Sequence, residues 1–331
     1  MSAEPFPYSR ISILGGGAWG TALALAAIAA GRSTILWARE PEVVDAIAKD
    51  RENPFLPGVK LPRALAATCD LREAMKADAL LLATPAQVVS EFARALSPLI
   101  VPGTPLAICA KGMAQESGRL LPELLAEALP QAEISILSGP SFARDVALGR
   151  PTAVTIAGKH AKPLQASLGS LSFRPYVSED VIGVALGGAA KNVYAIACGV
   201  VEGLGLGENA RGALLARGFA ELVRMGEALG ARQETLMGLS GLGDMVLSAT
   251  SKSSRNFSFG LALGQGKSPA ALKTQGHPLA EGVTTAPALV KRARALKIEL
   301  PIAEAMADLL SGTLALDEAT GRLMTRKLGA E

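Results

Sequence analysis

Hydrophobic positions along the chain follow two patterns, and the change between them lies near Ser178. Before Ser178, short runs of branched aliphatic residues alternate with helical segments, which is typical of an α/β protein with a doubly wound sheet. The runs predict about seven or eight strands, with candidates at residues 11–14, 34–37, 79–83, 105–110, 134–137, 152–157 and 173–177. Between them the pattern predicts helices over residues 21–30, 43–49, 86–96 and 119–129.

After Ser178 the alternation that marks strands almost disappears. Helical runs follow instead, at residues 181–201, 209–229, 258–263, 287–296 and 302–310. We therefore expect an α/β domain over residues 1–178 and an all-α domain over residues 179–331. No flexible linker separates the two, so the helix that begins at Val181 is expected to span the junction.

The first predicted strand runs directly into a glycine-rich turn, Gly15-x-Gly17-x-x-Gly20, which opens a helix. Gly15 permits a tight turn, Gly17 lets the backbone approach a pyrophosphate, and Gly20 allows the helix to pack close to the strand. The free N–H groups at a helix N-terminus attract phosphates. A second strand follows within about 30 residues, which completes a Rossmann-type βαβ unit, and we expect a dinucleotide at Gly15, Gly17, Ala18 and Gly20.

Arg39 and Glu40 follow the end of the second predicted strand. In dinucleotide-binding folds this position usually carries an acidic residue that accepts a hydrogen bond from the adenosine ribose. Glu40 would suit the free ribose of NAD, whereas Arg39 would suit the 2′-phosphate of NADP or stack on adenine. Both cofactors stay open, and so does a third interpretation, in which the two charges form a solvated pair.

Composition narrows the class of protein. The chain has 331 residues, of which 49% are hydrophobic, 19% charged and 4% aromatic, so it is expected to fold into two apolar cores rather than to be disordered. The formal net charge is only +3, without blocks of lysine or arginine, and nucleic-acid binding is not indicated. The mild positive charge suits a small anionic substrate.

Two apolar stretches imitate membrane segments. Residues 11–31 resemble a signal peptide but contain the glycine turn, and residues 181–201 carry Lys191 and Asn192 at their middle, where a charge would cost roughly 2.5–3.5 kcal/mol on insertion. We expect no membrane span. The three cysteines are scattered along the chain and are expected to be buried, structural thiols of a cytoplasmic protein.

Lys191 is the sole charge in a run of some twenty apolar and small residues. Desolvation lowers the pKa of a lysine, which allows proton exchange near neutral pH, while an anionic neighbour keeps a lysine charged. The chain has only two histidines, so a serine–histidine–aspartate triad or a histidine metal site has little support, and no metal is predicted. Lys191 is therefore the candidate general acid and base, although a lysine that reaches the surface at a helix edge would fit the same pattern.

A second polar cluster follows the glycine-rich segment 238–243. Asp244 lies where a helix starts, so a helix N-cap is one interpretation of it. Ser254, Arg255 and Asn256 combine a guanidinium fork with short polar donors, which suits the recognition of an anion. For each of these residues a purely structural role stays equally open.

Several motifs in order resemble a known family. They are Gly15-Gly-Gly-Ala-Trp-Gly-Thr-Ala-Leu-Ala24, Leu36-Trp-Ala-Arg39, Phe55-Leu-Pro-Gly58, Lys111-Gly112, Gly139-Pro-Ser-Phe-Ala143, Ala189-Ala-Lys-Asn192, Gly241-Leu-Gly-Asp244, Ser254-Arg-Asn256 and Glu281-Gly282. Nearly end to end, the sequence is similar to the bacterial NAD(P)-dependent glycerol-3-phosphate dehydrogenases. The resemblance implies reversible hydride transfer between NAD(P)H and dihydroxyacetone phosphate, which supplies sn-glycerol 3-phosphate for phospholipid synthesis.

The resemblance also implies roles for residues at matching positions. Cofactor contacts would come from Trp19, Arg39, Lys111, Ala143, Arg255, Leu279 and Glu281. The substrate would be surrounded by Lys111, Gly139, Ser141, Lys191, Asp244, Ser254, Arg255 and Asn256, with Lys191 as the proton-transfer residue. Two departures are small: Gly16 stands where alanine is frequent, and Ser248-Ala249 stands where threonine and cysteine are common, so the hydroxyl contact is expected to be kept and the thiol lost.

Two other functions stay open at this point. A related reductase with the same two-domain plan, acting on a phosphosugar acid or a ketoacid, would differ in its anion clamp. A regulator that binds NADP without catalysis would lack a working Lys191. The sequence leaves the preference between NAD and NADP open, and also the oligomeric state, for which a homodimer is one candidate.

Overall fold

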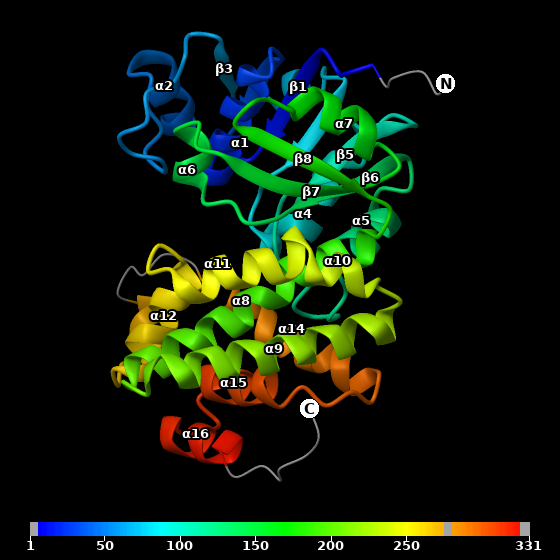
Figure 1. Ribbon diagram of the computed structural model, residues 1–331. Helices are drawn as coiled ribbons and strands as arrows, with labels where there is room; N and C mark the ends of the chain where they lie inside the picture. The colour runs from blue at the N-terminus through cyan, green and yellow to red at the C-terminus, as the bar shows by residue number, and fades with distance from the viewer. Residues whose placement is uncertain (1–5, 275–279, 325–331) are drawn as a thin grey trace. The chain divides into compact units, whose positions relative to one another are not determined.

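The computed structural model describes residues 6–274 and 280–324 and divides the chain into two compact units (Figure 1). Unit 1 comprises residues 1–111 and 121–185, and unit 2 comprises residues 112–120 and 186–331. The division falls inside helix α8 (Val181–Gly203), whereas the hydrophobic pattern places its change after Ser178. The assignment of residues 112–120 to unit 2 has no counterpart in that pattern.

Unit 1 is built on one sheet of eight strands. In chain order the strands are β1 (Arg10–Leu14), β2 (Ser33–Trp37), β3 (Leu65–Thr68), β4 (Ala79–Leu82), β5 (Thr104–Ile108), β6 (Ala132–Ser138), β7 (Thr152–Gly158) and β8 (Phe173–Ser178). Their order across the sheet is β3-β2-β1-β4-β5-β6-β7-β8, and every neighbouring pair is parallel except β6 with β7. The predicted α/β class with a doubly wound sheet is confirmed.

The helices of unit 1 follow the strands and pack in two groups. They are α1 (Ala18–Ala29), α2 (Pro41–Lys49), α3 (Leu71–Ala74), the 3₁₀ turn η1 (Ala86–Val88), α4 (Val89–Leu96), α5 (Leu121–Ala128), α6 (Ala143–Ala147) and α7 (Ala161–Leu168). Helix α1 packs against α6 and α7, whereas α4 packs against α5. Strand order reverses at β1, so right-handed crossovers place α1 and α4 on opposite faces of the sheet.

The reversal of strand order creates a switch point between β1 and β4. In such sheets a ligand binds outside the carboxyl ends of the strands at this point. The carboxyl ends are tied together here, because Gly15 N donates to Trp37 O at 3.0 Å and Ala83 N donates to Leu14 O at 2.9 Å. The glycine turn therefore lies where the topology predicts a ligand.

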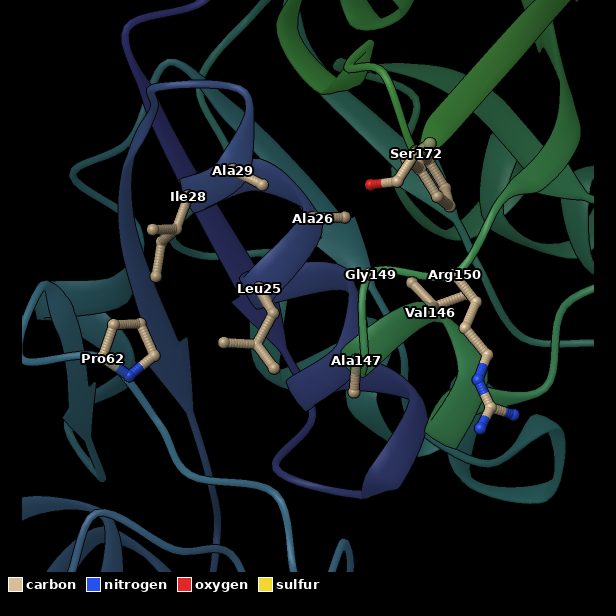
Figure 2. A pocket seen from close by; sticks show the side chains of 11 residues that line it. Leu25, Ala26, Ile28, Ala29, Pro62, Val146, Ala147, Gly149, Arg150 and Ser172 are labelled. Carbon is tan, nitrogen blue, oxygen red and sulfur yellow. The ribbon is translucent and has the colours of Figure 1, made fainter.

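A shallow pocket of about 250 Å³ elsewhere in unit 1 is mostly apolar (Figure 2). Leu25 and Ile28 of α1 lie on one side of it, and Ala147 of α6 lies on another. Arg150 also lines the pocket, but its guanidinium is paired with Asp145. We interpret this pocket as a packing seam between α1 and α6, because its described lining residues offer no cluster of reactive groups.

The cysteines differ in exposure. Cys109 and Cys198 are buried, and burial raises the pKa of the Cys198 thiol to about 12. Cys69 is exposed, so the expectation of three buried thiols is wrong for this residue. Cys69 follows β3, which is the edge strand of the sheet and leaves the residues after it with less cover.

The named elements of unit 2 are all helices, as predicted for the second domain. They are α8, α9 (Gly207–Leu229), α10 (Gln233–Met237), the π-helical turn η2 (Leu239–Gly243), α11 (Asp244–Thr250), α12 (Arg255–Gly264), α13 (Pro269–Thr274), α14 (Gly282–Ala295), α15 (Pro301–Ser311) and α16 (Leu316–Met324). The segment 112–120 belongs with them because Lys291 of α14 donates a hydrogen bond to Glu116 O.

Helix α8 is the only described helix that is long and apolar enough to cross a membrane. Within its most apolar window, 89% of the residues are buried inside the protein, which is the behaviour of a core helix. Burial extends to Lys191 and Asn192, which are 7% and 2% exposed. The charged and amide groups of this helix must therefore find partners inside the fold.

Helices α8 and α12 cross at unusually short distance because glycines face each other. A Cβ atom built on Gly199 would lie 2.1 Å from Phe257 O, and one built on Gly260 would lie 2.0 Å from Ile196 O. A side chain at either position would collide with a carbonyl oxygen of the other helix, so glycine at both positions allows the two backbones to pack in direct contact. This crossing brings Asn256 of α12 beside Asn192 of α8.

Glu221 of α9 is a buried carboxylate that accepts hydrogen bonds from the first turn of α15. Its carboxylate oxygens accept from Ile302 N at 2.7 Å and Ala303 N at 3.2 Å, and Tyr194 Oη donates to it at 3.3 Å. Burial raises the pKa of Glu221 to about 7, against the opposing effect of the two backbone N–H groups.

This raised pKa predicts a pH-dependent stability. Because the folded protein binds the Glu221 proton more tightly than the unfolded chain, the contribution of Glu221 is fully present below pH 4.5 and is lost as the pH rises through about 7. The loss should be on the order of 3 kcal/mol. Urea unfolding at pH 5 and pH 8 should show a smaller decrease for Glu221→Gln than for wild type.

A glutamine at residue 221 has one acceptor oxygen in place of the two that bind Ile302 N and Ala303 N, so the change with pH, not the absolute stability, is the quantity to compare. Glu227→Gln, on an exposed position of the same helix, is the matched control and should keep the wild-type pH dependence. Equal pH dependence in wild type and Glu221→Gln would show that Glu221 does not titrate in this range.

Candidate functional site

The glycine turn has the backbone conformation that its sequence predicts. Gly15 has a φ of +136°, and a Cβ there would lie 2.8 Å from the backbone of Ala83. A Cβ on Gly20 would lie 1.9 Å from Gly15 O, so α1 can start this close to β1 only with glycine at that position. A Cβ on Gly16 would lie 2.5 Å from the Ala38 Cβ, which explains why alanine does not fit at this departure from the family motif.

The start of α1 is suited to an anionic ligand. Gly17 is its N-cap residue and makes no side-chain capping hydrogen bond, and the space around a Cβ on Gly17 is free of heavy atoms within 4 Å. The first N–H groups of a helix lack partners within the helix. Thr84, which follows β4, is 8% exposed, and its hydroxyl has no hydrogen-bond partner among the described residues. These donors fit the pyrophosphate and ribose oxygens of a dinucleotide.

Two other predicted cofactor residues of unit 1, Trp19 and Arg39, have partners within the protein. The indole N–H of Trp19 donates to Cys109 O at 3.0 Å, which ties the start of α1 to the end of β5. Arg39 donates to Glu40 Oε1 at 2.8 Å, and 79% of its side chain is exposed. The solvated-pair interpretation thus describes Arg39 and Glu40 here, and a role in cofactor choice stays a prediction.

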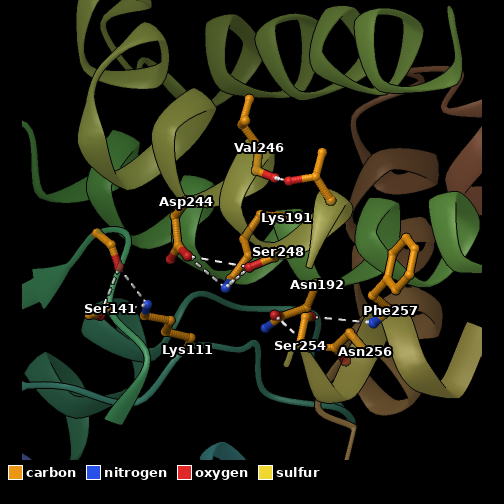
Figure 3. A network of polar contacts seen from close by, with 12 residues as sticks. Lys111, Ser141, Lys191, Asn192, Asp244, Val246, Ser248, Ser254, Asn256 and Phe257 are labelled. Carbon is orange, nitrogen blue, oxygen red and sulfur yellow. Dashed lines mark hydrogen bonds and ion pairs between the residues drawn. The ribbon is translucent and has the colours of Figure 1, made fainter. Parts of the chain in front are cut away.

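Lys111, Gly139 and Ser141 form one cluster in unit 1. Lys111 Nζ donates to Gly139 O at 2.8 Å and to Ser141 Oγ at 3.4 Å. Lys111 and Ser141 point toward each other in Figure 3. Gly139 has a φ of +151°, and a Cβ on it would lie 2.8 Å from Val154 Cα, so the chain turns here only with glycine. Ala143 begins α6 directly afterwards. The structure thus brings together residues that lie about 30 positions apart in the sequence.

Lys191 forms a buried polar cluster in unit 2 (Figure 3). Its ammonium donates to Asp244 Oδ1 at 2.8 Å and to Ser248 Oγ at 2.6 Å. Asp244 and Ser248 are each 1% exposed. The interpretation of Lys191 as a lysine that reaches the surface is therefore wrong, because the apolar surface of α8 is covered and its charge is compensated inside the fold.

The π-helical turn η2, which directly precedes Asp244, places this residue within hydrogen-bond distance of Lys191. A Cβ on Gly241 would lie 1.9 Å from Leu236 O, and a Cβ on Gly187 of α8 would lie 2.8 Å from Ser240 O. Glycine on both sides lets the turn η2 pack against α8, and α11 then begins at Asp244. The N-cap residue of α11 is Gly243 and Asp244 is the first residue of the helix, so the interpretation of Asp244 as the N-cap is wrong.

Asn192 is a functional candidate that the sequence does not single out as a site residue. Its Oδ1 accepts from Asn256 Nδ2 at 2.8 Å, and Asn256 Oδ1 accepts from Gly282 N at 2.9 Å. The Nδ2 atom of Asn192 is buried and has no hydrogen-bond partner among the described residues. A buried donor without a partner beside Lys191 is a feature that a bound substrate oxygen would satisfy.

The remaining predicted residues differ in their surroundings. Ser254 is the N-cap of α12 and accepts from Phe257 N at 3.3 Å, whereas the next residue, Arg255, is exposed. Glu281 precedes α14, and its carbonyl accepts from Thr285 N at 3.0 Å. Leu279 lies outside the described residues.

Two family models match the chain. The model of the N-terminal domain of NAD-dependent glycerol-3-phosphate dehydrogenase matches residues 10–163, and that of the C-terminal domain matches residues 180–321. The glycerol-3-phosphate dehydrogenase [NAD(P)+] of Parvibaculum lavamentivorans is 51% identical over 98% of both chains. That of Rhodospirillum rubrum is 53% identical over 97% of this chain and 94% of its own.

Solved structures are similar over the same length. Glycerol-3-phosphate dehydrogenase from Coxiella burnetii has a TM-score of 0.92 and 38% identity, and the match covers 97% of this chain and 100% of that one. A ketopantoate reductase from Ralstonia eutropha has a TM-score of 0.60 at 17% identity over 94% of this chain and 99% of its own, which shows a shared fold alone.

Proposed function

The chain belongs to the NAD-dependent glycerol-3-phosphate dehydrogenase family, and we propose that it reduces dihydroxyacetone phosphate reversibly with Lys191 as the proton donor. The observation that carries this proposal is the buried contact of the Lys191 ammonium with Asp244 and Ser248. A general acid needs a fixed position and an available proton, and this arrangement supplies both.

Reduction of dihydroxyacetone phosphate to sn-glycerol 3-phosphate requires one hydride and one proton. NADH or NADPH, when bound, would supply the hydride for the reduction of the substrate carbonyl carbon. Lys191 Nζ donates a proton to the carbonyl oxygen, so that the C=O bond becomes the C–OH of sn-glycerol 3-phosphate. In the reverse direction the neutral Lys191 amine takes that proton back.

Asp244 and Ser248 act on the substrate through Lys191. The carboxylate holds the ammonium at 2.8 Å, and the Ser248 hydroxyl accepts from the same ammonium at 2.6 Å. These two contacts fix the position and the orientation of the ammonium. Such fixed donors stabilise the charge that develops on the oxygen in the transition state.

The phosphate of the substrate is assigned to the region around the start of α12. Arg255 is the first residue of α12 and is exposed there. Asn192 contributes its Nδ2, a buried donor that has no partner within the part of the chain that the structure describes, and its Oδ1 accepts from Asn256 Nδ2. Binding energy from the phosphate positions a small ketone that otherwise offers few contacts.

In unit 1 the N–H groups of the glycine turn would hold the pyrophosphate, with Trp19 and Lys111 as further predicted contacts. Ala143, Arg255, Leu279 and Glu281 are the other predicted cofactor residues. Either NAD or NADP fits the family. Dinucleotide binding by unit 1 is the part of the proposal that holds even if the substrate assignment changes.

The preference between the cofactors depends on Arg39 in this proposal. Arg39→Ala should raise the KM for NADPH about tenfold and that for NADH much less, because a guanidinium pairs with a 2′-phosphate. Glu40→Gln should favour NADPH, since it removes the carboxylate that binds Arg39 at 2.8 Å. Initial rates with both cofactors measure these ratios, and an equal rise of both KM values in Arg39→Ala would favour adenine stacking instead.

The decisive assay follows the oxidation of NADH and NADPH in the presence of dihydroxyacetone phosphate, with an unphosphorylated ketoacid as the comparison substrate. Turnover of dihydroxyacetone phosphate alone supports the proposal. Turnover of the ketoacid would indicate the related reductases, and dinucleotide binding without turnover would indicate a regulator. We further propose a cytoplasmic enzyme that acts as a homodimer and supplies sn-glycerol 3-phosphate to phospholipid synthesis, which sedimentation and gene-replacement experiments can test.

A further inference from the structure

A buried asparagine from the loop after α2 is bonded to the glycine turn. Asn53 is 1% exposed. Its Nδ2 donates to Gly16 O at 2.8 Å and to Thr21 Oγ1 at 2.7 Å, and its Oδ1 accepts from Phe55 N at 2.9 Å. Both amide hydrogens and the amide oxygen are therefore used inside the protein, so Asn53 has no free donor with which to bind a ligand itself.

The chain of hydrogen bonds continues through Thr21. The Thr21 hydroxyl accepts from Asn53 and donates to Gly17 O at 3.0 Å, and Thr21 N donates to the same oxygen at 3.0 Å. Two successive carbonyl groups of the turn, those of Gly16 and Gly17, are thus held by side chains. These carbonyls belong to a run of three glycines, whose backbone would otherwise have more conformational freedom than that of any other residue.

A held carbonyl also fixes the direction of the next N–H group. The peptide bond is planar, and the described backbone contains no cis peptide, so C=O and the following N–H point in opposite directions. Holding Gly16 O sets the direction of the Gly17 N–H, and holding Gly17 O sets that of the Ala18 N–H. Both N–H groups lie at the start of α1, where an anion is expected.

We propose that Asn53 is a positioning residue for the dinucleotide. Through Gly16 O and the Thr21 hydroxyl it fixes the N–H groups of Gly17 and Ala18 before the cofactor binds. Cofactor binding then does not have to order the glycine turn, and the affinity for the cofactor is higher. The inference rests on the proposed function only for the location of the pyrophosphate, and it extends that function to a residue that does not touch the ligand.

The test compares four variants of two residues. Asn53→Ala and Asn53→Asp remove the amide donor, Thr21→Val removes the hydroxyl at nearly constant volume, and Thr21→Ser keeps it. We expect the Kd for NADH, measured by fluorescence titration, and the KM for NADH to rise about tenfold in the first three variants and by less than about twofold in Thr21→Ser. The KM for dihydroxyacetone phosphate should stay unchanged in all four.

Two comparisons separate this role from a general loss of stability. A variant that is only partly folded has a lower apparent kcat with unchanged KM, whereas loss of a positioned N–H raises the Kd and KM of the cofactor. The double variant Asn53→Ala/Thr21→Val should lose little more affinity than either single variant, because both act in one chain of hydrogen bonds. Glu52→Gln, at a half-buried position of the same loop where the side chain is paired with Lys60, is the control and should leave the Kd unchanged.

A folded Asn53→Ala variant with the wild-type Kd for NADH would overturn the proposal, as would Thr21→Ser losing as much affinity as Thr21→Val. If Asn53→Ala does not fold, Thr21→Val against Thr21→Ser decides the question alone. The Kd comparison does not require turnover, so failure of dihydroxyacetone phosphate as a substrate would leave this test intact. An inability of the wild-type protein to bind any dinucleotide would overturn both proposals.

Discussion

Replacing Lys191 by methionine is expected to lower kcat for dihydroxyacetone phosphate by about 10²–10⁴-fold, while the Kd for NADH stays within about twofold of the wild-type value. The substitution removes the proton donor and the positive charge that stabilises the forming alkoxide, but the apolar stem of the side chain is replaced by one of similar volume. Lys191 belongs to unit 2, whereas the expected dinucleotide turn belongs to unit 1. Turnover and cofactor binding should therefore separate, which stopped-flow rates and NADH titration measure.

The buried ion pair complicates this experiment and also supplies its control. Lys191→Met leaves Asp244, which is 1% exposed, without its positive partner, and such unpaired buried charges cost about 3–5 kcal/mol. The double variant Lys191→Met/Asp244→Asn removes both charges and should recover much of the lost thermal stability without recovering kcat. Asp244→Asn alone keeps the proton donor and should retain more activity than either. Substantial kcat in a folded Lys191→Met variant would show that another group supplies the proton.

The same residue illustrates what a sequence can reveal about a site. A single charge inside a long apolar helix has few structural explanations, so Lys191 stands out before its partners are known. The partner Asp244 does not stand out, because an aspartate at the start of a helix is most often a cap. The roles of Asn53 and Asn192 cannot be predicted from the sequence, since they depend on backbone groups and on a carboxamide far along the chain.

Some elements of the fold also could not be predicted from the sequence. Strand β3 consists of four residues, Leu65–Thr68, and is too short to show a period. The antiparallel pairing of β6 with β7 cannot be read from alternation, which is the same for either strand direction. Elements α10, η2 and α11 contain a glycine-rich segment that intrinsic propensities assign to a turn. Close packing against α8, where Gly187 faces Ser240 O, overrides those propensities.

Removal of the Arg255 guanidinium should penalise a phosphorylated substrate far more than an unphosphorylated one. Arg255 begins α12 and is exposed, so its charge is available to an anion. A hydrogen bond to a charged group contributes about 1.5–3 kcal/mol, which corresponds to roughly ten- to more than a hundredfold in kcat/KM. Arg255→Ala should therefore lose this factor with dihydroxyacetone phosphate and little with dihydroxyacetone, each measured at saturating NADPH.

Two further variants decide whether geometry or charge is responsible. Arg255→Lys keeps the charge but loses the planar fork, and it should recover only part of kcat/KM, because a single ammonium cannot bind two phosphate oxygens in the same way. Lys252→Ala removes one positive charge from an exposed position three residues earlier and should leave the ratio of the two substrates unchanged. An equal loss for both substrates in Arg255→Ala would instead place Arg255 at the cofactor. In that case Asn192, with its buried donor, would become the leading candidate for the phosphate contact.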